Sequence, residues 1–105
     1  MGGANPDINL KDGNTALTFA IRLGRLDLVQ ILLRARANIN KPDSSGSTGL
    51  MWASHIGDLT IIKQLLKVKG ISLKTKNRGG LSALGLAQAN KNLAVIELLV
   101  RYGAT

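Results

Sequence analysis

The stretch Asp12-Gly13-Asn14-Thr15-Ala16-Leu17 combines a polar turn that contains a glycine, a hydroxyl residue and the start of an apolar segment. Glycine next to Asp and Asn is typical of a turn. The hydroxyl of a threonine can accept a hydrogen bond from the free N–H groups at the start of a helix. The stretch therefore predicts a turn followed by a helix whose N-cap is Thr15.

The same pattern returns at intervals of 33 and then 34 residues. Five sets of positions are in phase: Thr15, Thr48 and Ser82; Leu17, Leu50 and Leu84; Ala20, Ala53 and Ala87; Leu26, Leu59 and Leu93; and the pairs Leu32-Leu33, Leu65-Leu66 and Leu99-Val100. Self-similarity at such a spacing indicates a repeat architecture. We therefore expect three units, with the extra residue of the second interval in the connection 68–73.

Each unit is predicted to contain two antiparallel helices. A turn residue ends the first helix, and the three units place Gly24, Gly57 and Lys91 there. The second helix follows, with apolar residues at spacings of three and four. Lys91 is expected to cost stability if its position requires a positive φ. The fold class is thus all-α, one domain over 1–105, with repeats at about 5–37, 38–70 and 71–104.

From Asp12-Gly13-Asn14-Thr15-Ala16-Leu17 through Ala20, Gly24, Leu26 and Val29 to Ile39-Asn40, the sequence resembles the ankyrin repeat, and the resemblance extends over essentially the whole chain. It implies a solenoid whose helix pairs are joined by protruding β-hairpin loops. It also implies a concave face, built from the loop tips and the first helices, that binds a partner protein or peptide.

Two family residues are replaced in every unit. The proline of the family's Thr-Pro-Leu-His motif is replaced by Ala16, Gly49 and Ala83, and its histidine by Thr18, Met51 and Gly85. We therefore expect the hydrogen bonds that this histidine makes between neighbouring loops to be missing.

Catalysis and cofactor chemistry find little support in the composition. The chain has no cysteine, which excludes disulfides, thiolate nucleophiles and Cys-ligated metals. Its only histidine, His55, has no carboxylate cluster around it, and Asp58 is placed to open a second helix. Gly79-Gly80 beside Arg78 lacks a phosphate-loop motif and fits a hairpin turn. We expect no enzyme, no metal and no cofactor.

Cellular location is predicted from the same composition. No apolar run approaches the roughly 18 residues of a membrane span, and no signal-peptide pattern follows Met1. A cysteine-free chain also fits a reducing compartment. We expect a soluble, intracellular protein of the cytoplasm or nucleus.

The resemblance places partner contacts in the hairpin loops and at the ends of the first helices. The candidate partner-binding residues are Lys11, Asp12, Asn14, Arg22, Leu23, Ser44, Ser45, Ser47, Trp52, His55, Ile56, Lys76, Arg78, Leu81 and Asn90. Two hypotheses stay open for Trp52, which shares its repeat position with Phe19 and Leu86. It either packs between repeats or anchors a partner.

The chain is basic, with a formal charge of +8 from 14 basic and six acidic residues, and this favours an acidic partner. Six cations lie close together in the sequence: Lys63, Lys67, Lys69, Lys74, Lys76 and Arg78. A nucleic acid or an anionic membrane is the alternative partner, disfavoured because these cations fall on different sides of the repeat and base-stacking aromatics are few. A spacer segment of a larger scaffold is a third possibility. Apolar residues at both end units also predict self-association.

Overall fold

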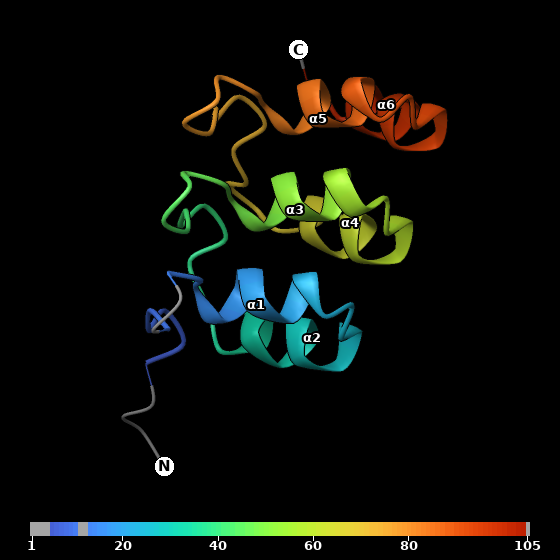
Figure 1. Ribbon diagram of the computed structural model, residues 1–105. Coiled ribbons are helices and arrows are strands. Elements are labelled where there is room, and N and C mark those ends of the chain that lie inside the picture. Colours follow the sequence, from blue (N-terminus) through green and yellow to red (C-terminus); the bar gives the residue numbers. More distant parts are fainter. Residues whose placement is uncertain (1–4, 11–12, 105) are drawn as a thin grey trace.

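In the computed structural model, which describes residues 5–10 and 13–104, the chain forms an all-α stack of three helix pairs (Figure 1). The helices of the described residues are α1 (Ala16–Arg22), α2 (Leu26–Arg34), α3 (Gly49–Ile56), α4 (Leu59–Leu66), α5 (Ala83–Ala89) and α6 (Leu93–Arg101). The first helices α1, α3 and α5 form one layer, and the second helices α2, α4 and α6 form the layer behind it. The predicted helical repeat fold is confirmed.

The first helices begin where the sequence predicts. The side chains of Thr15, Thr48 and Ser82 accept hydrogen bonds from the backbone N–H three residues later, at 3.1, 3.4 and 3.1 Å. Each of these N-cap residues is extended and buried. Each cap therefore satisfies one free N–H group of its helix.

The turn after each first helix uses a left-handed backbone conformation. Its φ angles are +70° at Gly24, +87° at Gly57 and +55° at Lys91. Glycine adopts this conformation freely, whereas a residue with a Cβ atom is strained in it. The positive φ on which the expected cost of Lys91 depends is therefore present, and the cost itself stays a prediction.

Replacing Lys91 by glycine is expected to raise the free energy of unfolding by about 1 kcal/mol, because the substitution removes this strain. The Lys91 side chain is exposed, so little packing is lost. Urea denaturation of the two proteins measures the difference. Arg36→Gly is the parallel test, because Arg36 also has a positive φ, +62°. If neither variant is more stable than the wild type, the assignment of strain is contradicted.

The extra residue of the second interval lies between α4 and the loop that follows. Relative to α2 and the left-handed Arg36, α4 ends one residue early at Leu66, and the left-handed residue comes one position late at Gly70. The insertion therefore lengthens a turn and leaves the stacked helices in phase.

The core includes the repeated leucine and alanine positions, together with isoleucine, valine and methionine side chains. The Leu17, Leu50 and Leu84 side chains are at most 7% exposed. At the C-terminal end of the stack, exposure rises at positions that are covered in the middle unit. Val100 is 53% exposed, whereas Leu66 at the matching position is 6% exposed. Burial at these positions thus depends on a following unit, as in a solenoid.

The three loops have hairpin-like backbone hydrogen bonds in matching places. The amides of Leu10, Asp43 and Asn77 donate to the carbonyls of Asn14, Ser47 and Leu81, at 2.8, 2.9 and 3.0 Å. Among the described residues these loops contain only an isolated antiparallel bridge between Asn9 and Thr15, and no strand. The loops are therefore tight turns with hairpin geometry.

Neighbouring loops are joined through the main chain. The Ser44 amide donates to the Gly13 carbonyl (3.0 Å), and the Arg78 amide donates to the Ser45 carbonyl (3.1 Å). At the family's histidine position, the Thr18 hydroxyl bonds within its own unit, and the Met51 side chain is buried. Backbone hydrogen bonds therefore connect the loops without that histidine.

Candidate functional site

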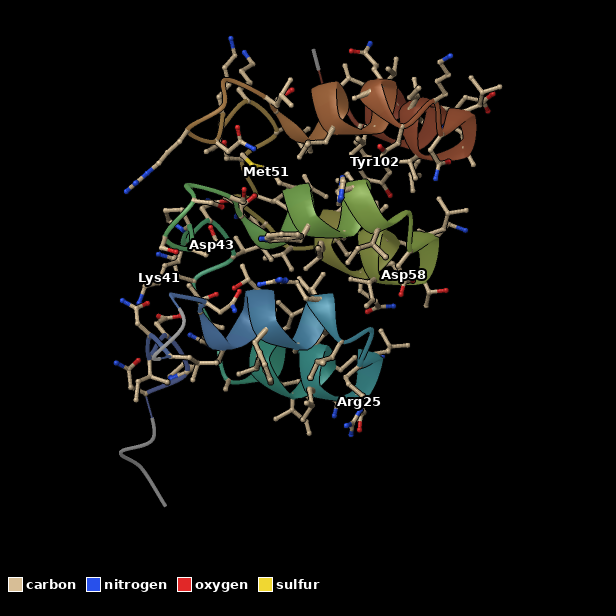
Figure 2. The ribbon with its side chains drawn as sticks, in the orientation of Figure 1. Arg25, Lys41, Asp43, Met51, Asp58 and Tyr102 are labelled. Atoms are coloured by element: carbon tan, nitrogen blue, oxygen red, sulfur yellow. The ribbon has the colours of Figure 1, made fainter. Side chains whose placement is uncertain are left out.

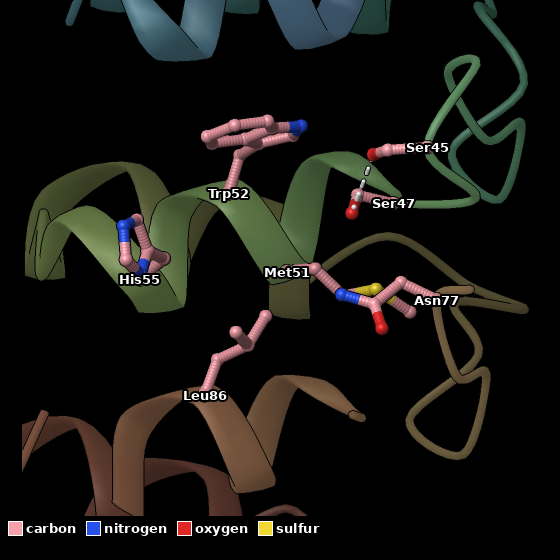
Figure 3. Close-up of a pocket in the computed structure, with 7 residues that line it drawn as sticks. All are labelled: Ser45, Ser47, Met51, Trp52, His55, Asn77 and Leu86. Carbon is pink, nitrogen blue, oxygen red and sulfur yellow. Dashed lines mark hydrogen bonds between the residues drawn. The ribbon is translucent and has the colours of Figure 1, made fainter. Parts of the chain in front are cut away.

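A hollow of about 270 Å³ opens on the inner face, the side of the molecule formed by α1, α3, α5 and the loops (Figure 3). Its lining residues come from α3, α5 and two loops: Ser45, Ser47, Met51, Trp52, His55, Asn77 and Leu86. The Met51, Trp52 and Leu86 side chains make its walls apolar, and the serines, His55 and Asn77 supply polar groups. Apolar walls with a few polar groups are typical of a binding site.

Trp52 is held in place from several directions. Its indole Nε1 donates to Asp43 Oδ2 at 2.7 Å. The Arg22 guanidinium of the first unit lies 4.3 Å from the centre of the ring, and the His55 ring meets it edge-on at 6.1 Å. Stacking of a guanidinium on an indole is a favourable cation–π contact. Trp52 therefore packs against the preceding unit and also forms a wall of the hollow.

Asp43 organises the second loop. Its Oδ1 accepts hydrogen bonds from the Ser45 amide (2.9 Å), the Ser45 hydroxyl (2.6 Å) and the Ser47 amide (3.0 Å). Partial burial by itself raises the pKa of this carboxyl, but the hydrogen bonds from Ser45, Trp52 and Ser47 together hold the pKa below its usual value. The carboxylate is thus ionised at neutral pH, and it fixes both the loop and Trp52 (Figure 2).

Sequence reasoning missed Asp43 as a site residue. An aspartate followed by Ser44-Ser45-Gly46 is a typical turn signal in which the carboxylate accepts from amides two or more residues ahead. That signal could have identified its role in the loop. Three further residues of the hollow were also missed: Leu86 shares the repeat position of Trp52, Met51 was considered only as the replacement of the family's histidine, and Asn77 of the third loop was not considered.

The predicted residues at the ends of the first helices are mostly exposed. The exposed fractions are 54% for Leu23 and 48% for Ile56. Arg22 is also exposed, and its guanidinium donates a hydrogen bond to Asn14 Oδ1 (3.0 Å). Asn14 itself is 4% exposed. Because buried Asn14 accepts this hydrogen bond, it helps to hold the Arg22 side chain in its orientation.

Exposed His55 and Asn90 connect the second and third units. Asn90 Nδ2 donates to the His55 carbonyl at 2.7 Å and lies 3.2 Å from His55 Nδ1. The pair therefore lies across the boundary between α3 and α5, at the rim of the hollow.

The loop residues predicted to contact a partner are distributed over the second and third loops. Ser44, Ser45, Lys76, Arg78 and Leu81 are exposed, and Ser47 is buried but lines the hollow. Lys11 and Asp12 lie outside the described residues. Partner contact at all these positions stays a prediction.

The described part of the chain was also searched for metal-ligand clusters and for membrane-spanning helices. Residues 5–10 and 13–104 contain no group of three His, Cys, Asp or Glu side chains that could hold a metal ion. None of the helices they form has the length and apolar character needed to cross a bilayer.

The stacked helix pairs and linked loops agree with the comparison with known protein families. A family model described as ankyrin repeats (3 copies) matches residues 2–77 and again residues 36–105. The chain belongs to the ankyrin repeat family. Ankyrin repeats are in general protein–protein interaction modules and are typically non-catalytic. No curated protein matches this ankyrin chain.

Proposed function

We propose that this ankyrin repeat chain binds a partner protein or peptide through its inner face, without catalysis, and that an apolar side chain of the partner enters the hollow beside Trp52. The observation that supports this most is the fixed position of Trp52. Its N–H group is already bonded to Asp43 and one contact of its ring is with Arg22. The indole therefore offers apolar surface with little loss of side-chain entropy on binding.

The surroundings of the hollow favour a partner segment that also contains acidic residues. Arg22, Lys76 and Arg78 are exposed on α1 and the third loop. The Asp43 carboxylate nearby is occupied by Ser45, Ser47 and Trp52, which reduces its repulsion of an acidic partner. Positive side chains at the rim of an interface increase the association rate and fix the orientation of an acidic segment. A location in the cytoplasm or nucleus is part of this proposal.

The test is a selection of peptides from a random displayed library against the folded chain, followed by titration. Trp52 is the only tryptophan, so its fluorescence reports binding at the hollow. We expect the selected peptides to contain a bulky apolar residue and carboxylates, and to change this emission. The double variant Leu23→Glu, Ile56→Glu should weaken binding by about tenfold or more, since it places charge on the inner face.

The matched control is Ile31→Glu, Val100→Glu, which removes two exposed apolar side chains, 56% and 53% exposed, from the second helices. It changes the net charge by the same amount and should leave binding unchanged. Equal loss in the two double variants, or peptides that bind without changing Trp52 emission, would rule out the inner-face site.

A further inference from the structure

A second groove lies on the outer layer of helices, between α4 and α6. We call it the outer groove. One part, of about 370 Å³, is lined by Thr60, Lys63, Gln64, Lys67, Leu98, Arg101 and Tyr102. A second part, of about 200 Å³, continues along the same helices and shares Lys63, Leu98 and Arg101. Figure 1 shows that α4 and α6 belong to the layer behind the first helices, whereas the hollow is lined by residues of α3, α5 and two loops.

Three cations converge on the outer groove from two helices. Lys63 lies on α4 and Lys67 is the C-cap residue of this helix, one turn further on, so the two lie on the same face. Arg101 comes from the last turn of α6. All three are exposed, and the only ion pair among the described residues is Arg25 with Asp27 (3.0 Å). These cations are therefore not neutralised by a carboxylate of the described chain.

The rest of the lining indicates what kind of ligand fits. The Thr60 hydroxyl, the Gln64 amide and the Tyr102 hydroxyl can form hydrogen bonds, and the Leu98 side chain supplies apolar surface between them. Glu97 is the only carboxylate among the residues that line the groove. It lies in the part of about 200 Å³, together with Leu59 and Ala94. The outer groove thus combines three cations, hydrogen-bonding groups and apolar surface, and this combination fits a single chain segment.

These features disfavour the other anionic partners. A nucleic acid would place phosphates along the whole groove, including the part lined by Glu97, whereas a protein segment can place an uncharged residue there. The groove has one aromatic residue, Tyr102, where single-stranded binding uses several for stacking. A bilayer surface is flat and cannot enter a groove between two helices.

We infer that the outer groove binds an acidic segment of a partner protein, with carboxylates facing Lys63, Lys67 and Arg101 and an apolar side chain packed on Leu98. This surface is separate from the hollow on the inner face, and the inference does not depend on the proposed function of that face. It would allow the chain to hold two partners at the same time.

The experiment is a titration of the isotope-labelled chain, followed by nuclear magnetic resonance, with a short synthetic peptide of alternating glutamate and leucine. We expect shifts at amides of α4 and α6, and these shifts should persist in the variant Leu23→Glu, Ile56→Glu, in which binding at the hollow is weakened. The variant Lys63→Glu, Lys67→Glu should weaken binding by about tenfold or more, and high salt should weaken binding to the wild type. The variant Lys63→Gln, Lys67→Gln, which only neutralises the charges, gives the same direction of change if the first variant folds poorly.

The matched control is Lys69→Glu, Lys74→Glu, which alters the net charge equally at two exposed lysines that follow α4 and do not line the outer groove. It should retain wild-type affinity. Equal weakening in the two variants would show attraction by bulk charge alone and overturn the inference. Absence of peptide binding, or stronger shifts of the same amides by phosphatidylserine vesicles or duplex DNA, would overturn it as well.

Discussion

Replacing Leu50 by alanine is expected to lower the free energy of unfolding by about 3 kcal/mol, because a buried leucine is lost and a cavity remains. The Leu50 side chain is 1% exposed and lies in α3, which packs against both α1 and α5. Units on both sides limit the ability of the site to collapse around the cavity. For a domain of this size, such a change is a large fraction of the total stability.

The comparison variant is Leu84→Ala, at the matching position of the last unit. The Leu84 side chain is 7% exposed, and α5 has a neighbouring first helix only on the side of α3. We therefore expect a loss about 1 kcal/mol smaller than for Leu50→Ala. Urea denaturation followed by far-ultraviolet circular dichroism measures both. Similar urea midpoints would show that the central unit is no better supported than the last.

Replacing Asp43 by alanine is expected to cost about 2–3 kcal/mol and to abolish peptide binding at the hollow. The carboxylate accepts hydrogen bonds from Ser45, Ser47 and the Trp52 indole. Its removal leaves the partly buried Ser47 amide and Trp52 indole N–H without their acceptor, which costs more than the loss of an exposed bond. Thermal unfolding and Trp52 fluorescence measure the two effects.

The control for charge alone is Asp43→Asn, which keeps one oxygen acceptor for the loop amides and should be less damaging than alanine. Equal stability of the alanine variant and the wild type would show that the loop does not depend on this carboxylate.

The lowered pKa of Asp43 predicts that the free energy of unfolding depends on pH. Its folded-state pKa is lowered, so the ionised form is favoured by folding. The stabilisation is present above the unfolded pKa of about 3.9 and is lost as the pH falls through the lower folded pKa. Acid titration below about pH 4 should therefore destabilise the wild type more than Asp43→Asn. Parallel titration curves for the two proteins would exclude this role.

The sequence predicts the fold well because its signals are local. Thr15, Thr48 and Ser82 need only a free N–H three residues ahead to act as caps. Gly24, Gly57 and Lys91 form their turns through their own backbone angles. Since these signals recur at a nearly constant spacing, three local predictions define one stack.

The candidate site is predicted less completely because its contacts join distant residues. Arg22 and Trp52 belong to different units, and nothing at either position alone indicates that they stack. The outer groove was missed for the same reason. Lys63 and Lys67 meet Arg101 across the boundary of two units, whereas the sequence grouped them with Lys76 and Arg78 of the loop.

The hydrogen bonds between neighbouring loops make each boundary of the stack separately observable. The Ser44 amide is bonded to Gly13, and the Arg78 amide to Ser45. Each amide exchanges its proton with solvent when the hydrogen bond between its two loops opens. The exchange rates at Ser44 and Arg78 would therefore report the opening of the first and of the second boundary between loops separately, within one intact chain.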